Sequence, residues 1–152
     1  PIDPMETSEE LMARLADIAA ALACDTVRAI EAGTARRIPQ DASKATYAPM
    51  LDRSLSPIDW TQPAQWVIDQ VRGLIPWPVA TACFGGTTFK IFRVEKTEQT
   101  TDCAPGTVLG LDKKGLLVAC GAGAVLRVTQ LQAQGGKRMA AADYFRGHPL
   151  SL

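Results

Sequence analysis

The sequence predicts a mainly β domain with helices: a small antiparallel barrel or sandwich with one packed helix, preceded by one long helix. Two observations support this class. Near the front of the chain, apolar residues recur every three to four positions, which is typical of an amphipathic helix. Beyond residue 79 the apolar period changes to two, and short apolar runs alternate with turns at roughly ten-residue intervals, as in small antiparallel β folds.

The long helix is expected over residues 8–32. Thr7 and Glu10 have the spacing of a capping box, in which each side chain accepts a hydrogen bond from the other residue's backbone N–H. Gly33 is a typical residue at a helix C-terminus. The apolar residues at helical spacing are Leu11, Leu15, Ile18, Leu22, Val27 and Ile30. Because only seven residues precede Ser8, little before this helix can cover its apolar stripe.

Residues 34–58 are predicted to be a polar connector with several prolines, and a second helix follows. Thr61 is its expected N-cap, Pro63 lies in its first turn, and Gly73 ends it. Three tryptophans lie in or beside this helix, at positions 60, 66 and 77. They suit stacking on nucleic-acid bases, but we interpret them as packing the helix onto the barrel.

The expected strands cover residues 80–84, 87–94, 107–111, 116–120 and 125–131, and a short helix covers residues 140–145. Gly85 and Gly86 suit a tight hairpin turn between the first two strands. Strict alternation along the second strand predicts that Phe89, Ile91 and Arg93 share one face.

Composition excludes several classes of protein. The 152 residues include 16 Lys+Arg and 16 Asp+Glu, and 47% are hydrophobic, which excludes a disordered chain. The charge is unevenly divided: residues 1–40 hold four basic and seven acidic side chains, whereas residues 41–152 hold twelve and nine. The second part therefore carries a net charge of +3. Any nucleic-acid binding by it is expected to be weak and salt-sensitive.

The residue types offer no catalytic or metal site. The sequence has no Asn, and His148 is its only histidine, so a buried His base or a His-rich metal site is not available. The four cysteines form no C-x-x-C pair. No apolar stretch approaches ~18 residues, and no signal peptide is evident, so a reduced cytoplasmic protein is expected.

Cations on a glycine-rich loop suggest a phosphate contact. Gly135 and Gly136 precede Lys137 and Arg138, so two adjacent cations are expected on an exposed loop. The alternative is that these are ordinary solvated charges.

The order of many short strings resembles the C-terminal half of methionyl-tRNA formyltransferases. The strings include T-Y-A at 46–48, I-D-W at 58–60, V-R-G-L at 71–74, P-W-P-V-A at 76–80, A-P-G-T-V at 104–108, G-L-L-V-A-C-G at 115–121, L-R-V at 126–128 and G-K-R-M at 136–139. The front helix is similar to the last helix of that family's catalytic domain. The resemblance extends over essentially the whole chain.

Members of this family transfer a formyl group from 10-formyltetrahydrofolate to the methionyl amino group of initiator tRNA. They join a Rossmann-like catalytic domain to an OB-like barrel that helps to hold the tRNA. The resemblance implies that residues 1–33 are the last catalytic-domain helix, 34–45 a linker and 46–152 the OB-like tRNA-binding domain. The catalytic Asn-x-His and Asp motifs are absent, so this chain alone is expected to be inactive, with no catalytic residue and no metal ligand.

The resemblance also suggests which cations contact tRNA. The family commonly has Lys in the string T-Y-A-x-K; this sequence has Met50 there, and Arg53 supplies a nearby cation. The expected tRNA-binding residues are Arg53, Lys137, Arg138, Arg72 and Lys90. Arg72 also suits a structural role at a helix C-terminus.

Other interpretations remain open at this point. Related formyltransferases that act on sugar nucleotides, or that hydrolyse formyltetrahydrofolate, have similar C-terminal modules. A free-standing OB-like module that binds nucleic acid or protein is a further alternative. The expected partners are initiator methionyl-tRNA and the chain's own catalytic domain, with no membrane. Without that domain, the front helix is expected to self-associate through its apolar stripe.

Overall fold

The computed structural model describes residues 1–150, which form two compact units. We call Pro1–Leu51 the front unit and Asp52–Leu152 the body. Within the described residues, no helix is long and apolar enough to cross a membrane.

The front unit is built on α1 (Ser8–Glu31), followed by a short 3₁₀ turn, η1 (Ala42–Lys44). The predicted capping box is confirmed, because the Thr7 hydroxyl accepts from the Glu10 backbone and the Glu10 carboxylate accepts from the Thr7 backbone. The helix ends one residue before its predicted limit, and Gly33 follows with a φ of +68°. None of the residues of α1 is buried.

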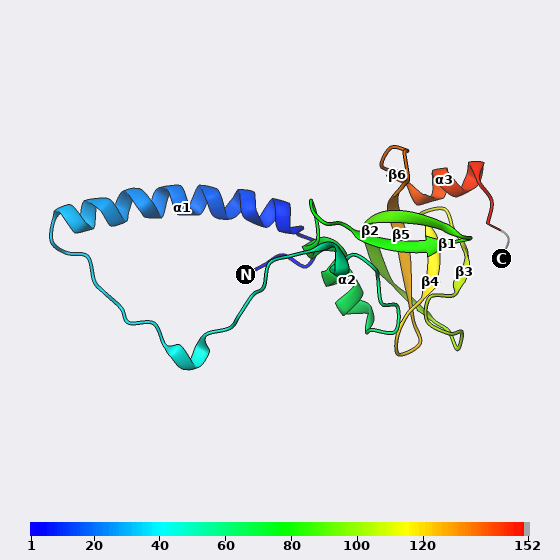
Figure 1. The fold of residues 1–152 in the computed structure, drawn as a ribbon, viewed down its shortest axis with the longest axis horizontal. Helices are drawn as coiled ribbons and strands as arrows, with labels where there is room; N and C mark the ends of the chain where they lie inside the picture. The colour runs from blue at the N-terminus through cyan, green and yellow to red at the C-terminus, as the bar shows by residue number, and fades with distance from the viewer. Residues whose placement is uncertain (151–152) are drawn as a thin grey trace. The chain divides into compact units, whose positions relative to one another are not determined.

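The body is mainly β structure with helices, as predicted. Its elements are η2 (Arg53–Leu55), α2 (Ala64–Gly73), β1 (Ala80–Phe84), β2 (Thr87–Thr100), β3 (Val108–Leu111), β4 (Leu116–Ala119), β5 (Ala124–Ala133), β6 (Met139–Ala140) and α3 (Ala141–Gly147). The strands form one antiparallel sheet in the order β1-β2-β5-β4-β3, with β6 paired to β5. Figure 1 shows this curved sheet with α2 and α3 at different sides of it. The finer OB-like description stays a prediction.

The core lies between the inner face of the sheet and α2. Val67 and Val71 of α2 are buried with Phe89 and Ile91 of β2 and Leu126 of β5. Residues that alternate along a strand point to opposite faces, so this packing fixes the neighbouring polar residues on the outer face.

The predicted alternation along β2 is wrong beyond Ile91. The pairing of β2 with β5 shifts register on both sides of Arg93, as expected for a β-bulge. Arg93 is consequently exposed, and Val94 is buried on the core side. A β-bulge is an extra residue in one strand of a pair, and it is defined by the pairing with the neighbouring strand. The period-2 pattern of a single strand therefore could not reveal it.

The predicted start of α2 is also wrong, because Thr61 is not its N-cap. The helix begins at Ala64 and Pro63 occupies the cap position, where its carbonyl accepts from the Val67 N–H. The Thr61 backbone N–H and hydroxyl both donate to Asp59 Oδ1, at 3.0 and 2.6 Å. These bonds, led by the one from the hydroxyl, hold the pKa of Asp59 below its ordinary value. An Asx-type turn therefore precedes the helix in place of a Thr cap.

The interpretation of the tryptophans as packing residues is confirmed only for Trp60. Its ring lies 6.2 Å from that of Phe84, and it packs against the buried core. Trp66 and Trp77 are 47% and 50% exposed. Val67 and Val71 lie on the buried face of α2. Trp66 directly precedes Val67 and therefore lies at the rim of that face.

Candidate functional site

Two adjoining cavities form a groove on the outer face of the body. The first cavity has a volume of about 440 Å³ and is lined by Arg53, Trp77 and Lys90, among others. The second has a volume of about 290 Å³ and is lined by Lys90, Gln132 and the start of the β5–β6 loop. Thr81 and Lys90 line both cavities. We call the two together the Lys90 groove.

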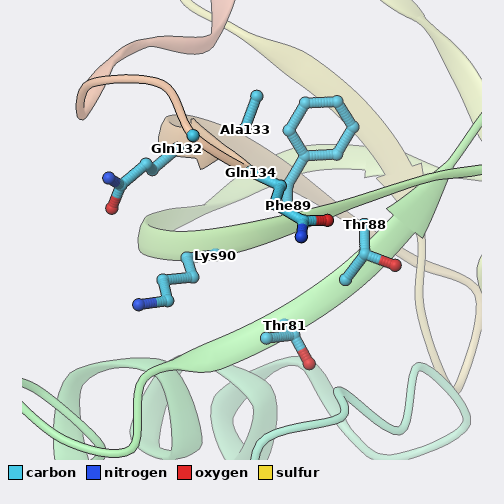
Figure 2. A pocket seen from close by; sticks show the side chains of 8 residues that line it. Thr81, Thr88, Phe89, Lys90, Gln132, Ala133 and Gln134 are labelled. Atoms are coloured by element: carbon cyan, nitrogen blue, oxygen red, sulfur yellow. The ribbon is translucent and has the colours of Figure 1, made fainter.

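A row of three polar residues across the sheet forms the floor of the groove. The strand register aligns Thr81 of β1 with Lys90 of β2, and Lys90 with Gln132 of β5. Figure 2 shows Lys90 and Gln132 extending in the same direction, whereas Phe89 points away from them. Burial of Phe89 and Ile91 in the core therefore fixes Lys90 on the outer face.

Arg53 reaches this groove because the segment that follows it is bonded to the edge of β1. The Thr81 N–H donates to the Ser56 carbonyl at 2.7 Å, and the Ile58 N–H donates to the Thr81 carbonyl at 2.9 Å. Pro57 thereby forms a parallel bridge with Thr81. This bridge brings η2, and with it Arg53, beside the strand that carries Thr81.

Side-chain hydrogen bonds hold η2 in this position from both sides. The Asp52 carboxylate accepts from the Ser54 N–H at 2.6 Å, and the Ser54 hydroxyl and N–H lower the pKa of Asp52. From α2, the amide Nε2 of Gln70 donates to the Leu55 and Pro57 carbonyls, at 2.8 and 3.0 Å. Gln70 therefore links α2 to the backbone directly after Arg53.

Lys137 and Arg138 lie on the β5–β6 loop, whose first glycine, Gly135, lines the second cavity. The Arg138 guanidinium donates to Gln130 Oε1, at 2.6 and 3.1 Å, and its Cζ lies 4.5 Å from the centre of the Phe92 ring. These contacts hold Arg138 along the outer face of the sheet, where both Lys137 and Arg138 are exposed.

Of the five predicted cations, the structure brings Arg53 and Lys90 together in one cavity, whereas Lys137, Arg138 and Arg72 are not among the described lining residues of either cavity. Arg53 and Lys90 line one cavity, and Lys137 and Arg138 belong to the loop that borders the other. Arg72 is in the last turn of α2. It is absent from the described residues that line the two cavities. Its Nε lies 2.7 Å from Asp69 Oδ1.

The groove has a positive character. None of its lining residues, all within the described part of the chain, is acidic. Within residues 1–150, no carboxylate lies within ion-pair distance of Arg53, Lys90 or Lys137. Lysine and arginine side chains that have no acidic partner suit the binding of phosphate groups.

The lining residues that sequence reasoning did not predict include Trp77, Thr81 and Gln132. The period-2 pattern could have found Thr81 and Gln132, because each precedes or follows a core residue on its strand. The residue type of Trp77 suits stacking, but its exposure depends on the packing of the residues around it.

The side chains that line the groove suit the binding of an anionic ligand. The polar groups of the groove are two cations, hydroxyls and amides, which offer hydrogen bonds and positive charge to such a ligand. Among the described residues, no group of three or more His, Cys, Asp or Glu side chains is placed to hold a metal ion.

Cys120 is buried outside the groove. Its thiol donates to the Gln62 carbonyl, and burial raises the pKa of the thiol.

Comparison with known proteins connects this geometry to a family. Residues 51–149 match the family model described as "Formyl transferase, C-terminal domain". The chain is 39% identical to a methionyl-tRNA formyltransferase of Acidovorax ebreus (strain TPSY) over 152 residues, which is 99% of this chain and 47% of that protein. It is 40% identical to one of Bacillus velezensis over 146 residues, or 96% of this chain and 46% of that protein. The chain therefore spans less than half the length of these relatives.

Solved structures support the fold. A crystal structure of a HypX variant from Aquifex aeolicus superposes with a TM-score of 0.68 at 19% identity, covering 95% of this chain and 26% of that one. HypX crystallised in complex with tetrahydrofolic acid superposes with a TM-score of 0.58 over 78% of this chain and 21% of that one. At this level of identity the likeness concerns the fold alone. The family model matches residues 51–149, which are more than half of the chain and include every described lining residue of the Lys90 groove, so the chain belongs to the family of formyl transferase C-terminal domains.

Proposed function

We propose that the chain is the C-terminal part of a methionyl-tRNA formyltransferase and that its body contacts initiator tRNA. The observation that carries this proposal is the groove in which Arg53 and Lys90 converge without an acidic neighbour among the lining residues. It occurs in a chain 39–40% identical to curated relatives of that name. The backbone of tRNA is the polyanion that such a surface suits.

The proposal divides the work between two parts of a longer protein. The part of the relatives outside this chain would carry catalysis and bind 10-formyltetrahydrofolate as the formyl donor. Residues 1–33 would be the last helix of that catalytic domain, residues 34–45 a linker, and residues 46–152 an OB-like tRNA-binding domain. The exposed stripe of α1 would then pack against the catalytic domain, and the protein would act in the cytoplasm.

The loop cations support a second contact with the tRNA backbone. Arg138 is held against Phe92 and Gln130, so little conformational freedom remains for it to lose on binding. The exposed Lys137 adds a mobile charge beside it. Arg53, Lys90, Lys137 and Arg138 are the residues that we assign to tRNA contact, and Arg72 is assigned less directly because Asp69 pairs with it.

The test is charge reversal in the full-length enzyme. Lys137→Glu/Arg138→Glu is expected to weaken initiator methionyl-tRNA binding about tenfold or more, and to reduce the dependence of affinity on salt. Lys113→Glu/Lys114→Glu, in the β3–β4 turn, is the matched control because it makes the same change in charge. Unchanged affinity and salt dependence in the first variant would contradict the proposed tRNA contact.

Catalytic inactivity of this chain alone is part of the same proposal. With initiator methionyl-tRNA and 10-formyltetrahydrofolate, the 152-residue chain is expected to give no formyl-methionyl-tRNA, whereas the full-length protein is expected to turn over. Formylation by the isolated chain would show that the catalytic residues had been assigned to the wrong part of the protein.

A further inference from the structure

Trp77 exposes a large apolar ring system inside a positively charged groove. Its side chain is 50% exposed, and it lines the first cavity together with Arg53 and Lys90. Tryptophan carries the largest apolar surface of any side chain and is highly buried on average. A half-exposed indole in a groove therefore indicates a surface that a ligand can cover.

The backbone around Trp77 holds the indole in place. Leu74 and Ile75 before it, and Val79 after it, are 5% exposed or less. The Val79 N–H donates to the Leu74 carbonyl at 2.9 Å, which closes the turn that contains the tryptophan. Prolines on both sides of Trp77 further restrict this backbone. The indole is thus presented from a segment that is anchored in the core at both ends.

The rest of the first cavity defines the ligand. Two cations, Arg53 and Lys90, line it, and no acidic residue is found among its described lining residues. Its volume of about 440 Å³ lies in the range of roughly 300–1,000 Å³ that is usual for small-molecule sites. A ligand that suits these groups combines a flat aromatic face with a negative charge. One nucleotide of an RNA strand has both, provided that its base is unpaired.

We propose that this part of the Lys90 groove holds one unpaired nucleotide of the bound RNA, with its base stacked on Trp77 and its phosphate between Arg53 and Lys90. The inference rests on the proposed tRNA binding and adds a contact to a base. Stacking on an indole does not depend on counterion release, whereas the contacts of Arg53 and Lys90 with phosphate do. The two contributions can therefore be separated by varying the salt concentration.

The experiment measures binding of initiator tRNA to the 152-residue chain at several salt concentrations. Trp77→Leu is expected to weaken binding by about 5- to 150-fold, the range that corresponds to the loss of one stacked base, with an unchanged salt slope. Trp77→Phe keeps a stacking ring and is expected to retain most of the affinity. Lys90→Ala is expected to lower the salt slope by about one. Trp66→Leu is the matched control, since Trp66 is similarly exposed and lines neither cavity.

Fluorescence gives a second readout that uses only the conservative Trp77→Phe variant. Stacking quenches indole emission, so initiator tRNA is expected to quench the wild-type chain more than Trp77→Phe. Equal binding by wild type and Trp77→Leu, or equal quenching in wild type and Trp77→Phe, would overturn the stacking contact while leaving tRNA binding intact. Absence of tRNA binding by the wild-type chain would overturn the proposed function as well.

Discussion

The front unit and the body both contain regular apolar patterns, but only the body buries them. In α1, Leu15, Ile18 and Leu22 are 46–64% exposed, whereas Leu126 and Leu131 of β5 are 0% exposed. Helix α1 has its own capping box and good helical spacing, so local signals define it without any tertiary contact. The difference teaches that periodicity specifies an element, whereas burial depends on a partner surface.

The largest expected difference between the two units concerns apolar truncation. Leu126→Ala is expected to lower the free energy of unfolding of the body by about 2–5 kcal/mol, because it leaves a cavity in a fully buried site. Leu22→Ala in α1 is the matched control and is expected to change it by less than about 0.5 kcal/mol. Urea unfolding followed by tryptophan fluorescence checks both, since all three tryptophans are in the body. Equal losses would contradict the contrast.

The exposed stripe of α1 is expected to drive self-association of this chain. Fully burying one such side chain contributes about 1.5–3 kcal/mol, and several lie along one face, so a row of half-exposed residues supports pairing with a second copy. Sedimentation at high concentration is expected to show dimers or larger species. Leu15→Glu/Leu22→Glu is expected to restore a monomer. A strictly monomeric wild-type chain would show that the stripe tolerates water.

A smaller effect is expected from the ion pair between Asp112 and Arg127 in the body, whose Oδ2 and Nη2 lie 2.7 Å apart. The hydrogen bond from Arg127 is the main reason that the pKa of Asp112 is lowered. The ionised carboxylate therefore stabilises the fold above the ordinary Asp pKa of 3.8, and this stabilisation is lost as the pH falls below it. Asp112→Asn is expected to cost about 1–2 kcal/mol near neutral pH and to flatten the loss of stability in acid.

The control for this prediction is Asp143→Asn in the exposed pair with Arg146, where both side chains are more than half exposed. That change is expected to have an effect close to zero, because solvent screens the pair. If the two variants had the same acid profile, the assignment of acid-sensitive stability to Asp112 would be wrong.

Much of the fold could be predicted from the sequence. The capping box, β1 and the two-residue hairpin turn are set by local residue types and occur where predicted. The bulge at Arg93 and the extension of β2 to Thr100 depend on pairing with β5, so single-strand periodicity could not supply them. The start of α2 was missed because Asp59 competes for the hydrogen bonds of Thr61.

The candidate site was only partly predictable for a related reason. Lys90 follows from alternation along one strand, but its proximity to Arg53 depends on the bridge between Pro57 and Thr81, which joins segments far apart in the sequence. Likewise, the role of Gln70 in holding η2 is visible only when α2 is packed beside it. Residue type indicated which side chains carry charge, and tertiary contacts determined which of them meet.

The most direct measurement is the salt dependence of initiator-tRNA binding by two triple variants of the 152-residue chain. Arg53→Ala/Lys90→Ala/Lys137→Ala removes three cations from the body, and Arg28→Ala/Arg36→Ala/Arg37→Ala removes three from the front unit. If the body holds the tRNA, the first variant lowers the slope of log affinity against log salt by about 2–3, whereas the second leaves it near the wild-type value. Equal slopes for the two variants would contradict the assignment of tRNA binding to the Lys90 groove and the β5–β6 loop.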